Sequence, residues 1–369
     1  MTTTENPATD FETQVGAYAE RLFTTGLAAF EAYTIALGRQ LGLYDALAAQ
    51  GPSTAPELAA AAGIDARYAR EWLEQQATAG LLDVEGATDA DPDERRFSLS
   101  ASAQECLIRP DSLASMGPLF DFVTSLGSVM PALQDAFRTG AGVPYADYAV
   151  HDVQGDFNRP LFLNVLASEW LPSIPGLAER LSAPGASVAE IGCGEGWAAI
   201  GIAQAWPGVR VDGYDLDEAS IAAARKHAAD AGVADRVRFE VADVADTDSF
   251  DRAAHDLVFA FEMVHDLARP VQALGTMRRL GSADATYLVV DENAAEAFEP
   301  STENPVERFL YAASVLHCLP AGTTEPDSAA TGTVMRPDTM RRYASAAGFA
   351  DVGVLPIEHD LFRVYRLTV

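Results

Sequence analysis

A glycine-rich loop carries the clearest chemical signal in this chain. Residues 188–196 read V-A-E-I-G-C-G-E-G, an apolar run followed by glycines at alternate positions. Glycine lets the backbone turn sharply and lets a ligand come close. A helix beginning near Trp197 would offer free N–H groups to a carboxylate or phosphate. A dinucleotide-binding G-x-G-x-x-G pattern from Gly192 would need glycine or alanine where the chain has Trp197. The loop therefore predicts a nucleotide-sized ligand across a strand-to-helix turn, and not the pyrophosphate of a dinucleotide.

The spacing acid-x-G-x-G-x-G, with Glu190 as the acid, resembles the first motif of the class I methyltransferases that use S-adenosylmethionine (SAM). The resemblance implies an α/β fold with a Rossmann-like seven-stranded sheet, and SAM as the cofactor. Asp215 ends the next expected strand, where a carboxylate can accept both ribose hydroxyls. In the family, an acid at the position of Asp243 bonds the adenine. The expected cofactor-binding residues are Glu190, Gly192, Cys193, Gly194, Gly196, Asp215, Leu216, Asp243, Val244 and Phe261.

Further apolar runs after this loop match the remaining strands of such a sheet. We expect strands over 209–214, 237–241, 256–261 and 287–290, and a closing hairpin over 352–356 and 362–367. An Ala-rich helix is expected over 220–231. The acids at the strand ends match the rule that ligands bind at the carboxyl edge of doubly wound sheets.

A histidine after the fourth expected strand is the candidate base. His265 lies in V-H-D-L, which resembles the L-H-D-W motif of winged-helix O-methyltransferases, whose histidine deprotonates the acceptor hydroxyl. An imidazole pKa of about 6.5 suits that task. Leu267 replaces the family's tryptophan. Two glutamates orient the histidine in the family, and this chain matches only one of them, with Glu292. We expect His265 and Glu292 to be catalytic. A loop histidine bonded to backbone is the alternative.

Polar side chains in two other segments are candidates for binding the methyl acceptor. Asp156 and Asn158 lie in G-D-F-N-R-P-L-F, where Asn158 could instead cap a helix running to Trp170. A helix over 307–319, stopped before Pro320, would place Tyr311, Ser314 and Cys318 on one face with His317 beside them. In the family fold this insertion faces the acceptor. The expected acceptor-binding residues are Asp156, Asn158, Tyr311, Ser314 and His317, and a mixed buried face is the alternative.

The N-terminal part has the pattern of a winged helix-turn-helix. We expect helices over 11–47, broken at Gly38 and Gly42, and over 55–62 and 65–79, followed by a β-wing of 80–84 and 96–99. The module resembles the N-terminal domain of small-molecule O-methyltransferases, which dimerises and covers the partner's active site. A DNA-binding regulator is the alternative. Acidic residues beside Arg67 and Arg70 argue against it, because they cancel the positive field that a major-groove helix needs.

Composition narrows the range of partners. A chain with a formal net charge of −29 repels phosphate, so we expect a small-molecule substrate and no nucleic acid. No apolar run approaches the roughly 20 residues that span a bilayer, and the first residues lack a secretory pattern, so no membrane partner is expected. Three scattered cysteines fit a reducing cytoplasm. Six histidines without an H-x-x-x-H pattern predict no metal site.

These observations predict a cytoplasmic, homodimeric methyltransferase that moves a methyl group from SAM to a small hydroxylated or aromatic metabolite by in-line displacement. The expected domains are a winged-helix dimerisation and lid domain over 1–108, a helical connector over 109–182 that contributes to the substrate pocket, and a catalytic domain over 183–369. The chain most resembles actinobacterial winged-helix methyltransferases, whose acceptors are largely unassigned. Two alternatives stay open: non-methyl chemistry on SAM in the same fold, and a SAM-sensing winged-helix regulator.

Overall fold

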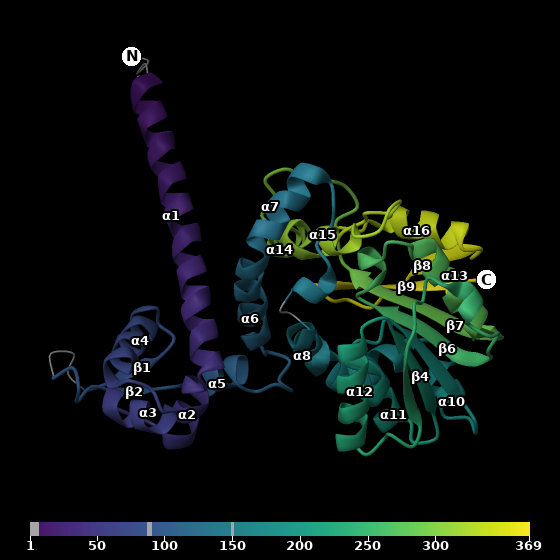
Figure 1. Cartoon of the computed structure of the whole chain (residues 1–369), viewed down its shortest axis with the longest axis horizontal. Coiled ribbons are helices and arrows are strands. Elements are labelled where there is room, and N and C mark those ends of the chain that lie inside the picture. The colour runs from purple at the N-terminus through teal and green to yellow at the C-terminus, as the bar shows by residue number, and fades with distance from the viewer. Residues whose placement is uncertain (1–6, 87–90, 149–150) are drawn as a thin grey trace, which may run out of the picture. The chain divides into compact units, whose positions relative to one another are not determined.

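The chain divides into two compact units, Met1–Thr124 and Ser125–Val369 (Figure 1). The structure, a computed structural model, describes residues 7–86, 91–148 and 151–369. The connector expected over 109–182 is shared between the two units, and the boundaries at 108 and 182 stay predictions. Within the described ranges, no helix combines the length and the apolar character that crossing a membrane requires.

The second unit is built on one seven-stranded sheet with the order β5-β4-β3-β6-β7-β9-β8. Strands β5 to β7 in this order are parallel, whereas β9 pairs antiparallel with β7 and β8. The strands are β3 (Ser187–Ile191), β4 (Arg210–Asp215), β5 (Val237–Val241), β6 (His255–Phe261), β7 (Gly281–Glu292), β8 (Asp351–Val354) and β9 (Phe362–Thr368). The chain runs outward from β3 on one side and from β6 on the other. The switch point where doubly wound sheets bind ligands therefore lies between β3 and β6.

The expected α/β class and all seven expected strands are confirmed. Strand β5 has the predicted bounds, whereas β7 begins at Gly281 and not at Tyr287. The first residues of β7, Gly281 to Thr286, carry no apolar run, so periodicity alone does not detect them. They join the sheet because Gly281 pairs with His255 of β6.

Helices cover both faces of this sheet. On one face, α11 (Trp197–Ala205) and α12 (Glu218–Asp230) pack against strand residues such as Val188 and Leu257. On the other, α13 (Pro270–Leu280) and α16 (Pro337–Ala346) pack against residues such as Ile191 and Val258. Burial on both faces explains why these strands read as continuous apolar runs. Shorter elements are η1 (Leu126–Val129), α7 (Met130–Thr139), η2 (Tyr145–Asp147), α9 (Leu171–Ser173), α10 (Leu177–Leu181), η4 (Thr247–Ser249) and η5 (Val264–Asp266).

Two π-helical segments correct the expected helices. The π-helix η3 (Phe162–Trp170) continues α8 (His151–Leu161), so Asn158 lies inside a helix and not at its N-cap. The π-helix η6 (Ser314–Cys318) joins α14 (Pro305–Ala313) to α15 (Leu319–Gly322). The chain stays helical past Pro320, because proline in the first turn of a helix loses no hydrogen bond. A π turn also changes which residues share a face, so the α-helical spacing does not hold beyond Ser314.

The first unit has the expected order of a winged helix. Its elements are α1 (Pro7–Gln40), α2 (Leu43–Gln50), α3 (Ala55–Ala62), α4 (Ala66–Thr78), β1 (Asp83–Glu85), β2 (Arg96–Ser98), α5 (Ala101–Leu107) and α6 (Gly117–Ser125). The break expected at Gly38 is absent. Gly38 lies inside α1 against the Trp72 ring, where a Cβ would come within 2.3 Å of a ring carbon. The chain turns at Gly42, which has φ 66°.

Both arginines of α4 are used in ion pairs. Arg67 pairs with Glu71 at 2.5 Å, and Arg70 pairs with Asp93 at 3.3 Å. These pairs leave α4 without a free basic face, which supports the expectation that the winged helix does not bind DNA.

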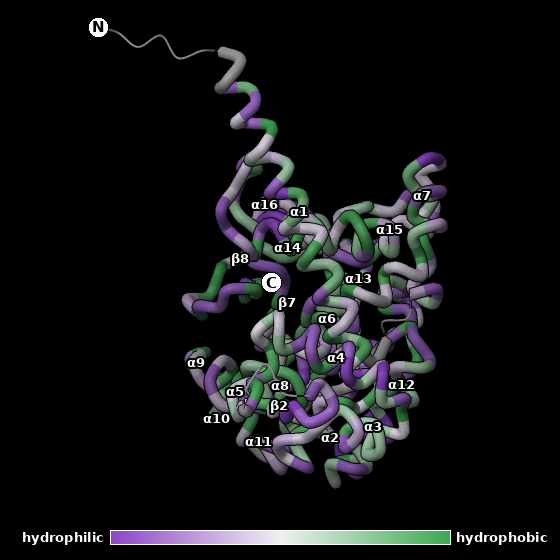
Figure 2. Tube along the Cα trace, turned by 90° about the vertical axis from the view of Figure 1, so that its left-hand side faces the viewer, coloured by the Kyte–Doolittle hydropathy of each residue, from purple (hydrophilic) through white to green (hydrophobic). Residues whose placement is uncertain are grey.

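Helix α1 exposes a long apolar face. Figure 2 shows hydrophobic and hydrophilic residues alternating along it. The exposed apolar residues include Phe11, Val15, Tyr18, Leu22, Phe23, Leu27, Phe30, Tyr33 and Leu37, of which Phe30 is 77% exposed. An exposed apolar surface of this length marks an interaction site in a folded protein.

Candidate active site

The loop between β3 and α11 forms the first wall of the site. Gly192, Gly194 and Gly196 have φ values of 67°, 48° and 79°, which strain any residue with a Cβ. At Gly192 a Cβ would lie 2.7 Å from Met263, and at Gly196 it would lie 2.4 Å from the Phe239 ring. The turn thus favours glycine at all three positions, and close packing also requires it at Gly192 and Gly196. Cys193 between them is buried in the core.

Asp215 ties this loop to the next strand. One of its oxygens accepts a hydrogen bond from the Gly194 N–H at 2.8 Å, and the other accepts from the Asp217 N–H at 2.9 Å. Burial raises the pKa of the Asp215 carboxyl, although the backbone donors oppose the shift. Leu216 follows it with 67% of its surface exposed. A carboxylate held by backbone donors beside an exposed apolar side chain is suited to bind a ribose.

Glu190, the penultimate residue of β3, is a buried acid with one unpartnered oxygen. It is 2% exposed, and its Oε2 has no hydrogen-bond partner. Burial, reinforced by the charge of Asp215, raises the pKa of Glu190 well above its ordinary value. A buried polar atom without a partner is costly unless a ligand satisfies it. The loop and Glu190 therefore fit a ligand that brings its own hydrogen-bonding groups.

The residues expected around the adenine lie after β5 and β6. Asp243 accepts from the Ala245 N–H at 2.8 Å and pairs with Arg269 at 2.6 Å. Arg269 also contacts Glu325 at 3.2 Å. Asp243 therefore already has a cationic partner, which the sequence did not indicate. Val244 is buried, and the buried Phe261 ring packs edge-to-face on Phe162 at 4.5 Å.

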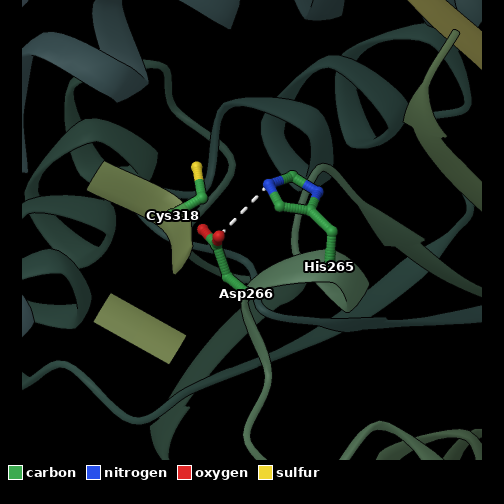
Figure 3. A group of neighbouring side chains, drawn as sticks. All are labelled: His265, Asp266 and Cys318. Atoms are coloured by element: carbon green, nitrogen blue, oxygen red, sulfur yellow. Dashed lines mark ion pairs between the residues drawn. The ribbon is translucent and has the colours of Figure 1, made fainter. Parts of the chain in front are cut away.

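His265 is held between two aspartates. Its Nδ1 lies 2.7 Å from Asp291 Oδ1, and its Nε2 lies 3.2 Å from Asp266 Oδ1. The side chain is 1% exposed. Figure 3 shows the Asp266 carboxylate directed at the imidazole. Burial alone would lower the pKa of His265, but Asp266, Asp291 and Glu292 together raise it well above the ordinary value. The carboxylates around the ring thus favour the protonated imidazole.

Glu292 is not the acid that bonds His265 Nδ1. Its backbone N–H donates to Asp291 Oδ1, whereas its own Oε2 is buried without a hydrogen-bond partner. Burial raises the pKa of the Glu292 carboxyl well above its ordinary range. Asp291 and Glu292 both lie close to the ring, with ligand atoms within 4.8 Å of one another, and Asp291 is the acid that bonds the Nδ1 atom.

Asn158 belongs to the same constellation. Its side-chain amide donates to the Glu262 carboxylate at the end of β6. Glu262 adopts a φ of 52°, a strained value for a residue with a side chain. Burial raises the pKa of Glu262 to about 7. Asp156, two residues earlier in α8, is half-buried.

The expected acceptor-binding residues of the insertion do not share one environment. Tyr311 lies on the surface, where its hydroxyl accepts from Arg336 at 3.0 Å. Ser314 is buried beside Gly332. His317 is buried, packs edge-to-face on Tyr148 at 4.6 Å, and has its Nδ1 3.5 Å from Cys318 Sγ. Only the π-helical end of the insertion, with His317 and Cys318, reaches the acids after β6.

The structure brings the strand-end residues together and adds three acids that the expected site lacked. Glu262, Asp266 and Asp291 join His265, Asn158 and His317. All three acids were detectable from their position at a strand end. Cys318, expected on the same helix face as Tyr311 and Ser314, lies beside His265 and Asp266.

Comparisons with known proteins agree with this geometry. Residues 182–325 match a family model described as a methyltransferase domain, and residues 29–109 match one described as an Rv2258c-like winged HTH domain. The ubiquinone biosynthesis O-methyltransferase of Bordetella avium (strain 197N) is 26% identical over 222 residues, 59% of this chain and 82% of that protein.

Solved structures share the fold over nearly the whole chain. An O-methyltransferase family protein from Burkholderia thailandensis has a TM-score of 0.69 at 18% identity, covering 95% of this chain and 97% of the other. Human N-acetylserotonin methyltransferase in complex with SAM has a TM-score of 0.67 at 17% identity, covering 100% of this chain and 99% of the other. At these identities the likeness establishes the fold alone.

The raised pKa of Glu190 predicts a pH-dependent stability. Because its folded pKa is raised, the folded state keeps a proton that the unfolded state loses, so unfolding becomes easier as the pH rises above the unfolded value. The penalty grows by about 1.4 kcal/mol per pH unit between the two pKa values. Glu190→Gln, which cannot ionise, should raise the Tm of the ligand-free protein more at pH 8 than at pH 5.

The exposed Glu299→Gln serves as the matched control and should leave the Tm unchanged at both pH values. A Tm difference for Glu190→Gln that stays constant with pH would show that Glu190 is ionised in the folded protein.

Proposed function

We propose that this chain, which belongs to the class I SAM-dependent methyltransferases and carries an N-terminal winged-helix domain, methylates a small-molecule acceptor. The observation that carries the proposal is the loop after β3, whose positive-φ glycines are tied to the carboxylate of Asp215. The acceptor we propose is a hydroxylated or aromatic metabolite. The high negative charge of the chain disfavours nucleic acid as the substrate.

The residues after β3, β4 and β5 would hold the cofactor. Glu190 and the loop backbone face the methionine part, Asp215 the ribose, and Asp243 the adenine. When bound, SAM supplies a methyl group on a positively charged sulfur, which the acceptor atom displaces in line. The protein contributes alignment and exclusion of water. The side chains after β6 and β7 stand beside this site because β6 is next to β3 in the sheet and β7 is next to β6.

The role of His265 as a base stays a prediction, and its two ion pairs set a requirement for that role. To accept a proton from the acceptor, His265 must first lose one and must part from Asp266, since both ring nitrogens face carboxylates. Asp291 would keep the ring oriented throughout. Asn158 and His317 are proposed to contact the acceptor because both border this cluster, and Glu292 is proposed to act through its charge.

We also propose that two copies of the chain pair through α1. Its exposed apolar face is too large to stay in water in a stable monomer. A second copy would cover it with the same residues, as a two-fold interface does. Three free thiols fit a reducing cytoplasm, and fractionation of the source cells would test this location.

Cofactor binding tests the proposed function directly. Asp215→Ala removes both the proposed ribose contacts and the anchor of Gly194, so the Kd for S-adenosylhomocysteine should rise at least about tenfold. Calorimetry measures it, and the exposed Asp230→Ala is the control that should bind as the wild type does. No heat with wild-type protein at micromolar concentration would contradict the proposal.

Turnover tests the base. Screening hydroxylated metabolites for release of S-adenosylhomocysteine identifies an acceptor, and His265→Ala should then lower kcat by about 100-fold or more at saturating cofactor. Activity within a few-fold of the wild type would exclude the base role.

Sedimentation tests the pairing of α1. The double variant Leu27→Glu, Phe30→Glu places charges on the exposed face and should convert the dimer to a monomer, because charges are costly in an apolar interface. Tyr68→Glu alters another strongly exposed aromatic residue, on α4, and should leave the dimer intact. A dimer in both variants would place the interface elsewhere.

A further inference from the structure

Asp266 is the accessible carboxylate among the acids that surround His265. Its side chain is 23% exposed, whereas Asp291 and Glu292 are buried. Burial works against the ionisation of Asp266, but the neighbouring His265 and His317 hold its pKa below the ordinary value. Asp266 therefore presents a negative charge at the part of this cluster that solvent reaches.

Three aromatic rings lie next to this carboxylate. The His317 ring packs edge-to-face on Tyr148, with centroids 4.6 Å apart, and on Tyr145, with centroids 5.8 Å apart. His317 Nδ1 lies 3.5 Å from Cys318 Sγ, and Cys318 lies beside Asp266 (Figure 3). Burial raises the pKa of both tyrosines, and the charge of Asp266 adds to the shift. We call the rings of Tyr145, Tyr148 and His317 the aromatic wall.

A carboxylate beside aromatic rings is suited to bind a cation. The negative face of a ring attracts an ammonium group, and a carboxylate accepts its hydrogen bonds. We propose that the methyl acceptor carries a protonated amine, which pairs with Asp266 and lies against the aromatic wall. The acids of the cluster repel an acceptor that carries a carboxylate or phosphate instead. The inference rests on the proposed function and adds the chemical class of the acceptor to it.

Two buried polar groups support a ligand that donates hydrogen bonds. Among the described residues, neither the Tyr148 hydroxyl nor Glu292 Oε2 has a hydrogen-bond partner. Tyr148 is 1% exposed and Glu292 is 4% exposed. Buried polar atoms without partners are costly unless a ligand satisfies them. A protonated amine carries only donors, and both of these oxygens can accept from it or from a hydroxyl group of the same molecule.

An ammonium group at Asp266 also meets the requirement for His265 to act as a base. In the part of the chain that the structure describes, His265 is the sole ion-pair partner of Asp266 and of Asp291. The ammonium group competes with the protonated imidazole for Asp266, so one cation replaces the other. His265 Nε2 then gives its proton to water, and its lone pair becomes free to accept a proton from the acceptor. Asp291 keeps its bond to Nδ1 throughout.

Calorimetry on the full-length protein, saturated with S-adenosylhomocysteine at pH 7, tests the amine. The probes are tyramine, meta-tyramine and dopamine, each compared with the phenolic alcohol in which a hydroxyl replaces the amine. At least one amine should bind at least about tenfold more tightly than its alcohol, because a charge-assisted hydrogen bond is stronger than a neutral one. The heat of amine binding should depend on the buffer, because His265 releases a proton.

Variants assign the preference to the proposed groups. Asp266→Asn should remove it, so that amine and alcohol bind alike. Asp248→Asn makes the same change at an exposed position and is the matched control, which should keep the preference. Tyr145→Leu leaves every charge in place and should weaken binding of the amine about threefold or more, with little effect on the alcohol.

Binding of S-adenosylhomocysteine to each variant reports whether it is folded. A wild-type protein that binds S-adenosylhomocysteine but binds no amine more tightly than its alcohol overturns the inference and leaves the proposed function standing. A preference that persists in folded Asp266→Asn overturns it as well. Failure of the wild type to bind S-adenosylhomocysteine would contradict the proposed function, and the inference with it.

Discussion

The parallel pairing of β4, β3, β6 and β7 is the constraint on which the site depends. Parallel strands bring their carboxyl ends to one edge of the sheet. The glycine loop, Asp215, Glu262 and Asp291 each follow or end one of these strands, so the order of the strands determines which side chains become neighbours. The hydrogen bond from the Gly194 N–H to Asp215 then closes the loop onto the sheet. Without this register, the acids would be unrelated turn residues.

Buried charge is the second theme of the structure. Glu190, Glu292 and His265 are each at most 4% exposed, and burial raises the pKa of both glutamates well above the ordinary value. Isolated charges at such depth are costly, so burial favours the protonated form of these glutamates. A cluster of this kind is poised to respond when a positively charged ligand arrives. The cost of burying these charged groups is therefore linked to ligand binding at the edge of the sheet, and the cluster contributes little to the stability of the fold.

The two units make different contributions. The second unit contains the whole of the strand-end cluster, from Asn158 to Cys318. The first unit has its own core around Tyr44, Trp72 and Phe97, and its helix α1 extends an apolar face that this core does not use. The paired arginines of α4 and the exposed apolar face of α1 support the proposed contact of this unit with protein.

The sequence by itself determined the fold class, the seven strands, the glycine loop and the place of Asp215 at a strand end. These features depend on local patterns of apolar residues, glycines and acids. Tertiary structure decided the partners. Asp291 bonds His265 Nδ1, although the adjacent Glu292 also lies close to the ring. Arg269 pairs with Asp243, and Cys318 approaches Asp266, through contacts between segments far apart in the chain. Such contacts depend on how helices pack and on a π turn, and neither leaves a periodic signal in the sequence.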